Sequence, residues 1–192
     1  MNKADLIFQY VDKRIQQLSK TGPWQTASLA KLRHGAGKPP GTTPEIWELT
    51  LSELPLELAS YMGSPSPSEW AIHLALTLFA IHQQGKSETV FARDVSFGSA
   101  VSQLITPGRK NESGVKSRFD AVLTSRGVLE FAHHARGLVQ LMRAGDVRMD
   151  YARFARDVYY YQLDDSQDRV RLRWGEDYYR INHLSDSNTE GE

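Results

Sequence analysis

The longest apolar region of the chain lies within residues 67–83, and its spacing predicts a helix that is hydrophobic on nearly every face. Ser66 and Glu69 form the pattern of a capping box, with Pro67 at the first helical position. A helix of this kind must be covered by other elements, so we expect it to be the central helix of the first half of the chain. His73 and His82 fall on it, and we expect both to be hydrogen-bonded core residues rather than metal ligands.

Amphipathic helical spacing recurs along most of the remaining chain. It predicts helices over residues 4–18, 24–33 and 44–49, the last with Thr43 as its N-cap, and a short helix after Ser96 that ends at Ile105. Four further helices follow residue 114, with Asp150 capping the third and Asp165 or Ser166 the fourth. Residues 88–94 are the only ones with strand-like composition, and we expect a loop or at most a minor strand there.

The stretch GRKNESG at residues 108–114 is polar and lacks apolar anchors, which is typical of a linker. We therefore predict an all-α fold with two small helical-bundle halves joined by a short linker. The N-terminal helical domain would cover residues 1–108 and the C-terminal helical bundle residues 109–184. Residues 185–192 are polar and acidic, and we expect a disordered tail.

Composition excludes several classes of protein. Lysine plus arginine and aspartate plus glutamate both total 23, so the chain is not a globally basic nucleic-acid binder. The absence of cysteine excludes disulfides and thiolate metal sites, and it is compatible with a reducing cytoplasm. The N-terminus lacks the apolar core of a signal peptide, and no apolar run is long enough to cross a bilayer. We expect a soluble cytoplasmic protein without a membrane segment.

Charge is nevertheless unevenly distributed, and residues 27–41 carry Lys31, Arg33 and Lys38 without a single acid. This stretch is predicted to be a helix end that opens into a loop, and its positive charge would attract an anion such as phosphate. GAGK within it is not a nucleotide-binding phosphate loop, because Leu32 and Pro39 stand where that motif needs glycine and Ser or Thr. The alternative is an ordinary solvated helix terminus.

Arginine rows run along three of the predicted C-terminal helices. One row holds Arg136 and Arg143, a second Arg153 and Arg156, and a third Arg169, Arg173 and Arg180. Eleven of the thirteen bases between residues 109 and 173 are arginine, which suits bidentate phosphate contact and stacking on bases. The alternative is a set of solvated helix faces, partly paired with nearby aspartates.

Tyr159, Tyr160 and Tyr161 cannot all face the core of one helix, because successive residues are about 100 degrees apart. At least one should be exposed or in an interface, where it would either stack on a base or contact a partner protein. No enzyme motif stands out, and Asp164 and Asp165 are more easily helix caps than metal ligands. We therefore expect no catalytic residue, metal, cofactor or small-molecule substrate.

Several segments, in their order, resemble the CasB family, the small subunit of the type I-E CRISPR Cascade complex. They run from LAKLRHGAGKPPGTTPEIWEL through LALTLFAIHQQ, VSFGSAVSQL, SGVKSRFDAVLTSR and FAHHARGLVQLM to MDYARFARDVYYYQ and VRLRWGEDYYR. The resemblance implies an all-helical, non-catalytic subunit that forms a dimer within Cascade, beside other subunits and the crRNA. There it would help to hold the RNA–DNA hybrid and the displaced single-stranded DNA of an R-loop.

The resemblance also implies which residues contact nucleic acid. The family's basic helix-to-loop motif falls on Lys31, Arg33 and Lys38, but His34 stands where relatives often have another arginine. Its basic positions in the second half are matched by Lys116, Arg118, Arg126, Arg136, Arg143, Arg153, Arg156 and Arg173. The alternative role is a protein–protein scaffold whose arginines meet acidic partner surfaces. A helix-turn-helix regulator is a third alternative, and it is less favoured because no recognition helix with a base-reading set of Asn, Gln and Arg stands out.

Overall fold

The computed structural model describes residues 2–60, 63–105 and 112–186, with side chains described up to residue 180. The predicted all-α class is confirmed, because the described part contains helices and, in place of a sheet, a single isolated bridge between Phe91 and Met149. The α-helices are α1 (Lys3–Leu18), α2 (Pro23–Gly35), α3 (Trp47–Thr50), α4 (Pro67–His82), α5 (Phe97–Ser102), α6 (Glu112–Leu123), α7 (Val128–Ala144), α8 (Tyr151–Tyr161) and α9 (Asp164–Asp186). Two 3₁₀ turns, η1 (Pro44–Ile46) and η2 (Leu56–Leu58), flank α3.

Helix starts follow local sequence signals in most cases. Ser66 and Glu69 form the predicted capping box at α4, and the side chain of Ser96 caps α5. Asp150 caps α8 by accepting hydrogen bonds from the backbone of Ala152 and Arg153. Each cap satisfies N–H groups that a helix leaves without an intrahelical acceptor.

Two predicted caps are wrong. The side chain of Thr43 makes no capping hydrogen bond, because the chain there turns through η1 before α3 begins at Trp47. The last helix begins at Asp164, so Asp165 and Ser166 lie inside its first turn. That helix also includes residues 185 and 186 of the tail predicted to be disordered, and residues 187–192 lie outside the described part.

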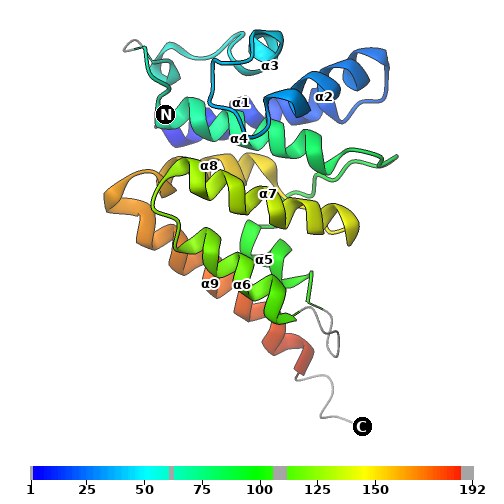
Figure 1. Cartoon of the computed structure of the whole chain (residues 1–192), viewed down its shortest axis with the longest axis vertical. Coiled ribbons are helices and arrows are strands. Elements are labelled where there is room, and N and C mark those ends of the chain that lie inside the picture. The colour runs from blue at the N-terminus through cyan, green and yellow to red at the C-terminus, as the bar shows by residue number, and fades with distance from the viewer. Residues whose placement is uncertain (1, 61–62, 106–111, 187–192) are drawn as a thin grey trace.

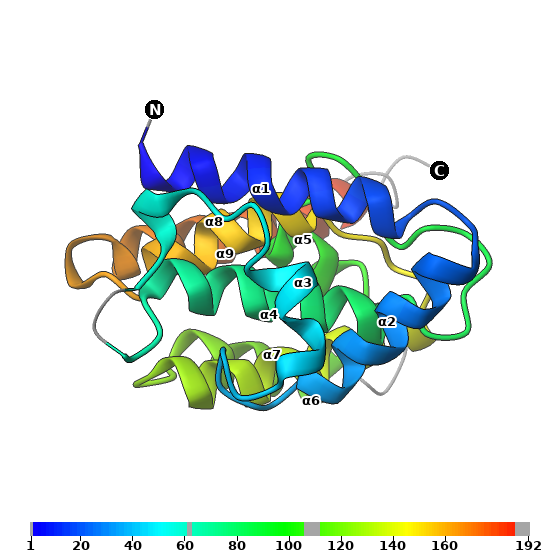
Figure 2. The same cartoon turned by 90° about the horizontal axis from the view of Figure 1, so that it is seen from above.

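Helix α4 lies at the centre of its neighbours, as its all-round hydrophobicity predicts. It packs against α1, α2, α7 and α8, and every residue from Ala71 to His82 is buried (Figures 1 and 2). His73 and His82 are hydrogen-bonded core residues, as expected. His73 Nε2 lies 3.1 Å from the carbonyl oxygen of Gly35, and His82 Nδ1 lies 3.0 Å from the Tyr151 hydroxyl.

Helices on either side of residues 106–111 share one hydrophobic core. Helix α8 packs on α1 and α4, and α5 packs on α9 rather than on the N-terminal helices that precede it. Trp174 of α9 is fully buried among Phe97, Phe131 and Phe154, with ring centroids 5.1 to 6.4 Å apart. The division into halves remains a prediction: residues 106–111 of the junction are not described, and residues 112–114 of the predicted linker belong to α6.

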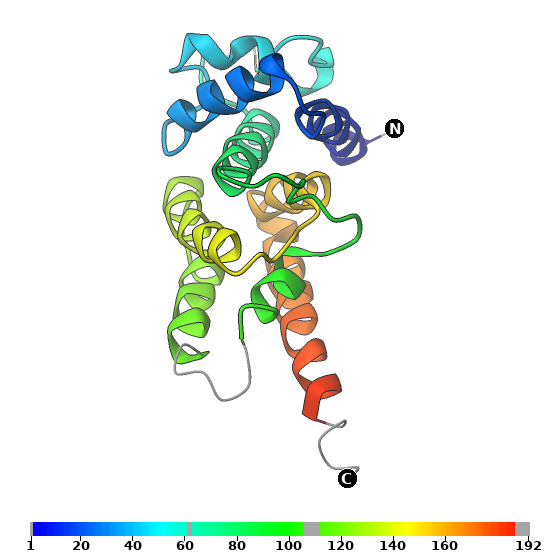
Figure 3. The same cartoon turned by 90° about the vertical axis from the view of Figure 1, so that its right-hand side faces the viewer.

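Two sides of the molecule differ in the helices they present. Figure 3 shows α7, α6 and the C-terminal end of α2 along one side, with α1, α8 and α9 along the other, and the view from above in Figure 2 agrees. The predicted nucleic-acid-binding residues are therefore divided between two sides of the fold.

Candidate nucleic-acid interface

The C-terminal end of α2 is fixed on α4 by a close backbone approach at Gly35. A Cβ atom at this position would lie 2.5 Å from Cδ1 of Ile46 and 3.5 Å from His73 and Thr77 of α4, so a side chain would require at least the Ile46 side chain to shift. The hydrogen bond between His73 and the Gly35 carbonyl ties the same turn to the core. The packing of α2 thus determines where the following loop, with its cations, begins.

Lys31 and Lys38 are exposed and Arg33 is half-buried at this end of α2. Among the residues that the structure describes, none forms an ion pair with any of the three. The neighbouring His34 is different, because its Nδ1 lies 3.0 Å from Oε1 of Glu45. The predicted cationic loop is therefore a surface with at least three charges left for an external anion.

Arg136 of α7 meets this loop at Gly37. A Cβ atom on Gly37 would lie 3.3 Å from NH1 of Arg136, and Gly37 has a φ of +84°, which a residue with a side chain rarely adopts. Glycine therefore allows both the turn and the close position of the guanidinium. The structure brings together two cationic segments that are far apart in the sequence.

Arg143 continues the predicted stripe along α7. His133, Arg136 and Gln140 are exposed, and Arg143 donates a hydrogen bond from NH1 to Oε1 of Gln84 at 2.9 Å. Neither arginine is paired with an acid in the described ranges. We call Lys31, Arg33, Lys38, Arg136 and Arg143 the cationic face.

Helix α6 and the turn after it carry three more of the predicted residues, on the side of the molecule that α7 shares (Figure 3). Lys116 is paired with Asp120 at 2.7 Å, which raises the pKa of the lysine through their hydrogen bond. Arg118 donates to the carbonyl of Gly114 at 3.2 Å, and Arg126 is exposed. Arg118 and Arg126 thus keep their net charge for a ligand, whereas the charge of Lys116 is offset.

Arg153, Arg156 and Arg173 belong to α8 and α9, on the other side of the molecule. Arg153 pairs with Asp177 at 3.3 Å, and Arg173 pairs with Asp157 at 2.6 Å. The guanidinium of Arg156 lies 5.5 Å from the centre of the Phe8 ring. These three arginines connect helices. The alternative of partly salt-bridged helix faces therefore applies to them, and it does not apply to the cationic face.

Asp157 explains why Arg173 is held so closely. Its carboxylate is fully buried and also accepts a hydrogen bond from Trp174 Nε1 at 3.0 Å. Burial raises the pKa of Asp157, while the charge of Arg173 and the Trp174 hydrogen bond act in the opposite direction. A buried carboxylate needs such partners, so Arg173 supports the fold at this position.

The three consecutive tyrosines are divided between core and surface, as helix geometry requires. Tyr161 is buried, and its hydroxyl donates towards the carbonyls of Val122 and Ser125 at 3.0 and 3.1 Å. Tyr159 and Tyr160 are half-buried, with ring centroids 5.5 Å apart. The role of Tyr160 in stacking or in a protein contact stays a prediction.

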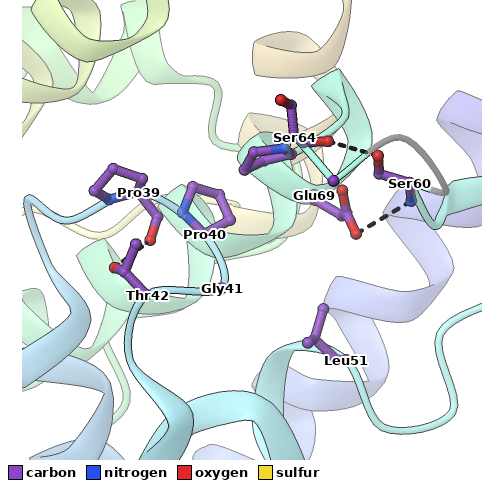
Figure 4. Close-up of a pocket in the computed structure, with 10 residues that line it drawn as sticks. Pro39, Pro40, Gly41, Thr42, Leu51, Ser60, Ser64 and Glu69 are labelled. Carbon is purple, nitrogen blue, oxygen red and sulfur yellow. Dashed lines mark hydrogen bonds between the residues drawn. The ribbon is translucent and has the colours of Figure 1, made fainter.

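A cavity of about 400 Å³ lies beside the exit of the cationic loop, between Pro39 to Thr42 and the segment around Ser64 (Figure 4). Its one acid is Glu69, whose two carboxylate oxygens accept hydrogen bonds from the backbone of Ser60 and Ser66. A carboxylate disfavours a phosphate, and Glu69 is already used as part of the α4 cap. The cavity therefore does not extend the cationic face.

No group of three or more acids and histidines that could hold a metal ion occurs in the described ranges. Asp164 and Asp165 are exposed in the first turn of α9, where the helix dipole favours them. In the same part of the chain, none of the helices combines the length and the hydropathy needed to cross a membrane.

Fold and site together define an all-helical protein with a surface of arginines and lysines that have no acidic partner among the described residues. The sequence matches the family model of the CRISPR-associated protein Cse2 over residues 28–179, so the chain belongs to the Cse2 family. No curated protein sequence matches it.

Solved structures agree with this family. CasB from Thermobifida fusca has a TM-score of 0.76 at 27% identity, over 90% of this chain and 97% of that one. CasB from Thermus thermophilus has a TM-score of 0.68 at 21% identity, over 93% and 99% of the two chains. A chain of a CRISPR RNA-guided surveillance complex has a TM-score of 0.72 at 20% identity, over 95% and 99%. The last two similarities concern the fold alone.

The role of Gly37 in allowing the close position of Arg136 was not predicted from the sequence. The GAGK stretch signals a turn, but its partner on α7 could be found only from the packing of α2 and α7 around α4. Helical spacing also does not show which arginines are paired with acids, as Arg153 and Arg173 are in the fold.

Proposed function

We propose that this protein is the non-catalytic small subunit of a type I-E CRISPR Cascade complex and that its cationic face holds a nucleic-acid strand. The strand would be the displaced single-stranded DNA of an R-loop, or the neighbouring backbone of the crRNA–DNA hybrid. The subunit would form a dimer within the complex and contact other Cascade subunits. Membership of the Cse2 family and the fold shared with a chain of a surveillance complex support this assignment.

The observation that carries the strand-holding role is the contact between Arg136 and the loop at Gly37. It joins cations from α2 and α7 into one surface, and those cations lack acidic partners in the described part of the chain. In an RNA-guided complex base pairing supplies sequence specificity, so a strand-holding subunit needs cations rather than a base-reading helix.

Two double variants that remove equal charge test this role. Arg33→Ala with Arg136→Ala removes two charges from the cationic face, and Arg169→Ala with Arg180→Ala removes two exposed charges from α9. We expect the first pair to weaken binding of single-stranded DNA at least tenfold, equally for different sequences, and the second to have little effect. Equal weakening by both pairs would contradict a localised strand site.

The alternative is a scaffold that contacts protein alone. Leu172 and Tyr179 favour some protein contact, because they are 65% and 49% exposed and lie two turns apart on α9. If Arg33→Ala with Arg136→Ala abolished assembly with partner subunits but left DNA affinity unchanged, the scaffold would be the better account.

A further inference from the structure

A second site lies at the corner where α1 ends and α2 begins. This corner is not part of the strand contact proposed above. Here a cavity of about 460 Å³ is lined chiefly by Arg14, Gln17, Lys20, Pro23, Trp24 and Gln25. The corner lies at the right-hand edge of the molecule in Figure 2, at the end of α1 opposite the N-terminus. Trp24 is 48% exposed, so one of the largest apolar side chains of the protein borders an open groove.

The side chains around this groove offer hydrogen-bond donors. Oε1 of Gln17 already accepts from Arg14 NH1 at 3.2 Å, and Oε1 of Gln25 accepts from the Thr26 hydroxyl at 3.3 Å. Each glutamine still offers its amide NH₂ group as a donor, together with a second lone pair on its oxygen. The Lys20 ammonium is exposed and has no acceptor among the described residues. Donors therefore predominate around this groove, which suits a ligand that carries acceptors.

The N-terminus of α2 adds backbone donors to the same place. Its N-cap is Gly22, which supplies no capping side chain, and Pro23 at the first position has no N–H. The N–H groups of Trp24 and Gln25 consequently lack an acceptor in the part of the chain that the structure describes. Such a helix start attracts anions, phosphate in particular.

Arg14 is a buried cation beside this groove, and its NH2 lies 3.6 Å from Oε2 of Glu53. Arg14 is only 7% exposed, yet it lines the cavity, and its Nε has no hydrogen-bond partner among the described residues. NH2 of the same guanidinium donates to the Ser52 carbonyl at 2.6 Å, which holds the side chain in place. The groove thus combines an ordered buried cation, a flexible lysine and an aromatic wall.

We propose that this groove binds a single unpaired nucleotide of a nucleic-acid strand. The base stacks on Trp24, its acceptor atoms meet the amide groups of Gln17 and Gln25, and the phosphate lies at Lys20 and the first turn of α2. An acidic peptide fits less well, because it could pair with the Lys20 ammonium but would leave the exposed face of Trp24 without a stacking partner.

This inference rests on the nucleic-acid role proposed above, but the two sites are physically separate. Helix α2 has 13 residues and is therefore about 20 Å long, with the groove at its start and the cationic loop at its end. A strand could reach both, or either one alone.

Nuclear magnetic resonance of the full chain with dAMP tests the site, with deoxyadenosine and inorganic phosphate as separate additions. We expect dAMP to shift the indole N–H signal of Trp24 and the backbone amide of Gln25. Deoxyadenosine should shift mainly the indole, and phosphate mainly the amide. Trp24→Ala should weaken dAMP binding about 5- to 150-fold, the usual range for a lost base–aromatic stack. Trp47→Ala is the matched control, since Trp47 is 44% exposed, and it should leave dAMP binding unchanged.

Several results would overturn the proposal. One is the absence of any shift at Trp24 and Gln25 with millimolar dAMP. Another is dAMP binding that is as tight in Trp24→Ala as in the wild type, which would mean that the groove binds the phosphate without stacking the base. A third is a response to an acidic peptide but not to dAMP.

The variant Arg33→Ala with Arg136→Ala separates this site from the cationic face, because it should lose strand affinity and keep the response to dAMP. If the wild type bound the strand through the cationic face but gave no dAMP response, this inference alone would fail.

Discussion

The guanidinium of Arg136 lies against Gly37, so close that a Cβ atom on residue 37 would be 3.3 Å from NH1. This contact joins α7 to the loop after α2 and makes one cationic surface from two segments. A substitution at Gly37 should therefore alter the position of the Arg136 side chain, although Gly37 itself carries no charge.

Gly37→Ala should weaken strand binding, whereas Gly41→Ala should not. Both glycines have a positive φ, +84° and +81°, so alanine at either position should lower the free energy of unfolding by about 1 kcal/mol. Only at Gly37 would the new methyl group press on Arg136, whose NH1 would have to shift by a few tenths of an ångström, because nothing lies within 4 Å of a Cβ at Gly41. Chemical denaturation and DNA-binding titrations of both variants check this, and equal DNA affinities would show that the Arg136 position is irrelevant.

Arg173→Ala should destabilise the fold more than it affects strand binding. It leaves the buried Asp157 without its closest charged partner, at an expected cost of about 2 to 3 kcal/mol in the free energy of unfolding. Arg169→Ala is the matched control on the same helix, because Arg169 is exposed and its one hydrogen-bond partner among the described residues is the Ser166 hydroxyl. It should cost well under 1 kcal/mol. Similar unfolding free energies for the two variants would contradict the structural role of Arg173.

The stability of the protein should fall between pH 6.5 and pH 4 partly because of His82. Burial lowers its pKa from 6.5 to about 4, so in this window the unfolded chain binds a proton at His82 that the folded chain does not. Unfolding is then favoured as the pH falls, by about 3 kcal/mol in total, and this contribution is fully restored above pH 6.5.

His82→Gln isolates that contribution from the other groups that titrate in the same range. The variant should be less stable at pH 7, since it loses the packing of the imidazole and its contact with the Tyr151 hydroxyl. Its unfolding free energy should nevertheless depend less steeply on pH between 6.5 and 4. An unchanged slope in denaturation curves would show that His82 is not protonated on unfolding.

The sequence predicted well the parts of the fold that depend on neighbours in the chain. The caps at Ser66, Ser96 and Asp150 are local hydrogen bonds, and the burial of α4 follows from its composition. The caps that were predicted wrongly lie where the path of the surrounding chain, rather than the local sequence, determines where the helix begins. At Thr43 the chain turns through η1 instead of entering a helix directly, and no spacing in the sequence distinguishes these two outcomes.

The candidate site was predictable as a set of residues but not as a surface. Arg136 and Arg153 occupy similar positions in similar stripes, so helical spacing treats them alike. Only the packing of α9 against α8 brings Asp177 to Arg153, whereas no acid approaches Arg136 in the described residues. Charge left unpaired after folding depends on tertiary contacts, which the order of residues in one helix does not reveal.

The salt dependence of single-stranded DNA binding tests the central claim, that the cationic face holds a strand, most directly. Each phosphate neutralised on a single strand contributes about 0.7 to the slope of log affinity against log salt concentration. Arg136→Ala with Arg143→Ala should therefore make the slope shallower by about 1.4 and weaken different sequences alike. The variant should stay folded, since neither arginine is paired with an acid and both lie on the polar stripe of α7. A slope equal to that of the wild type, with the variant folded, would contradict the strand-holding role of this face.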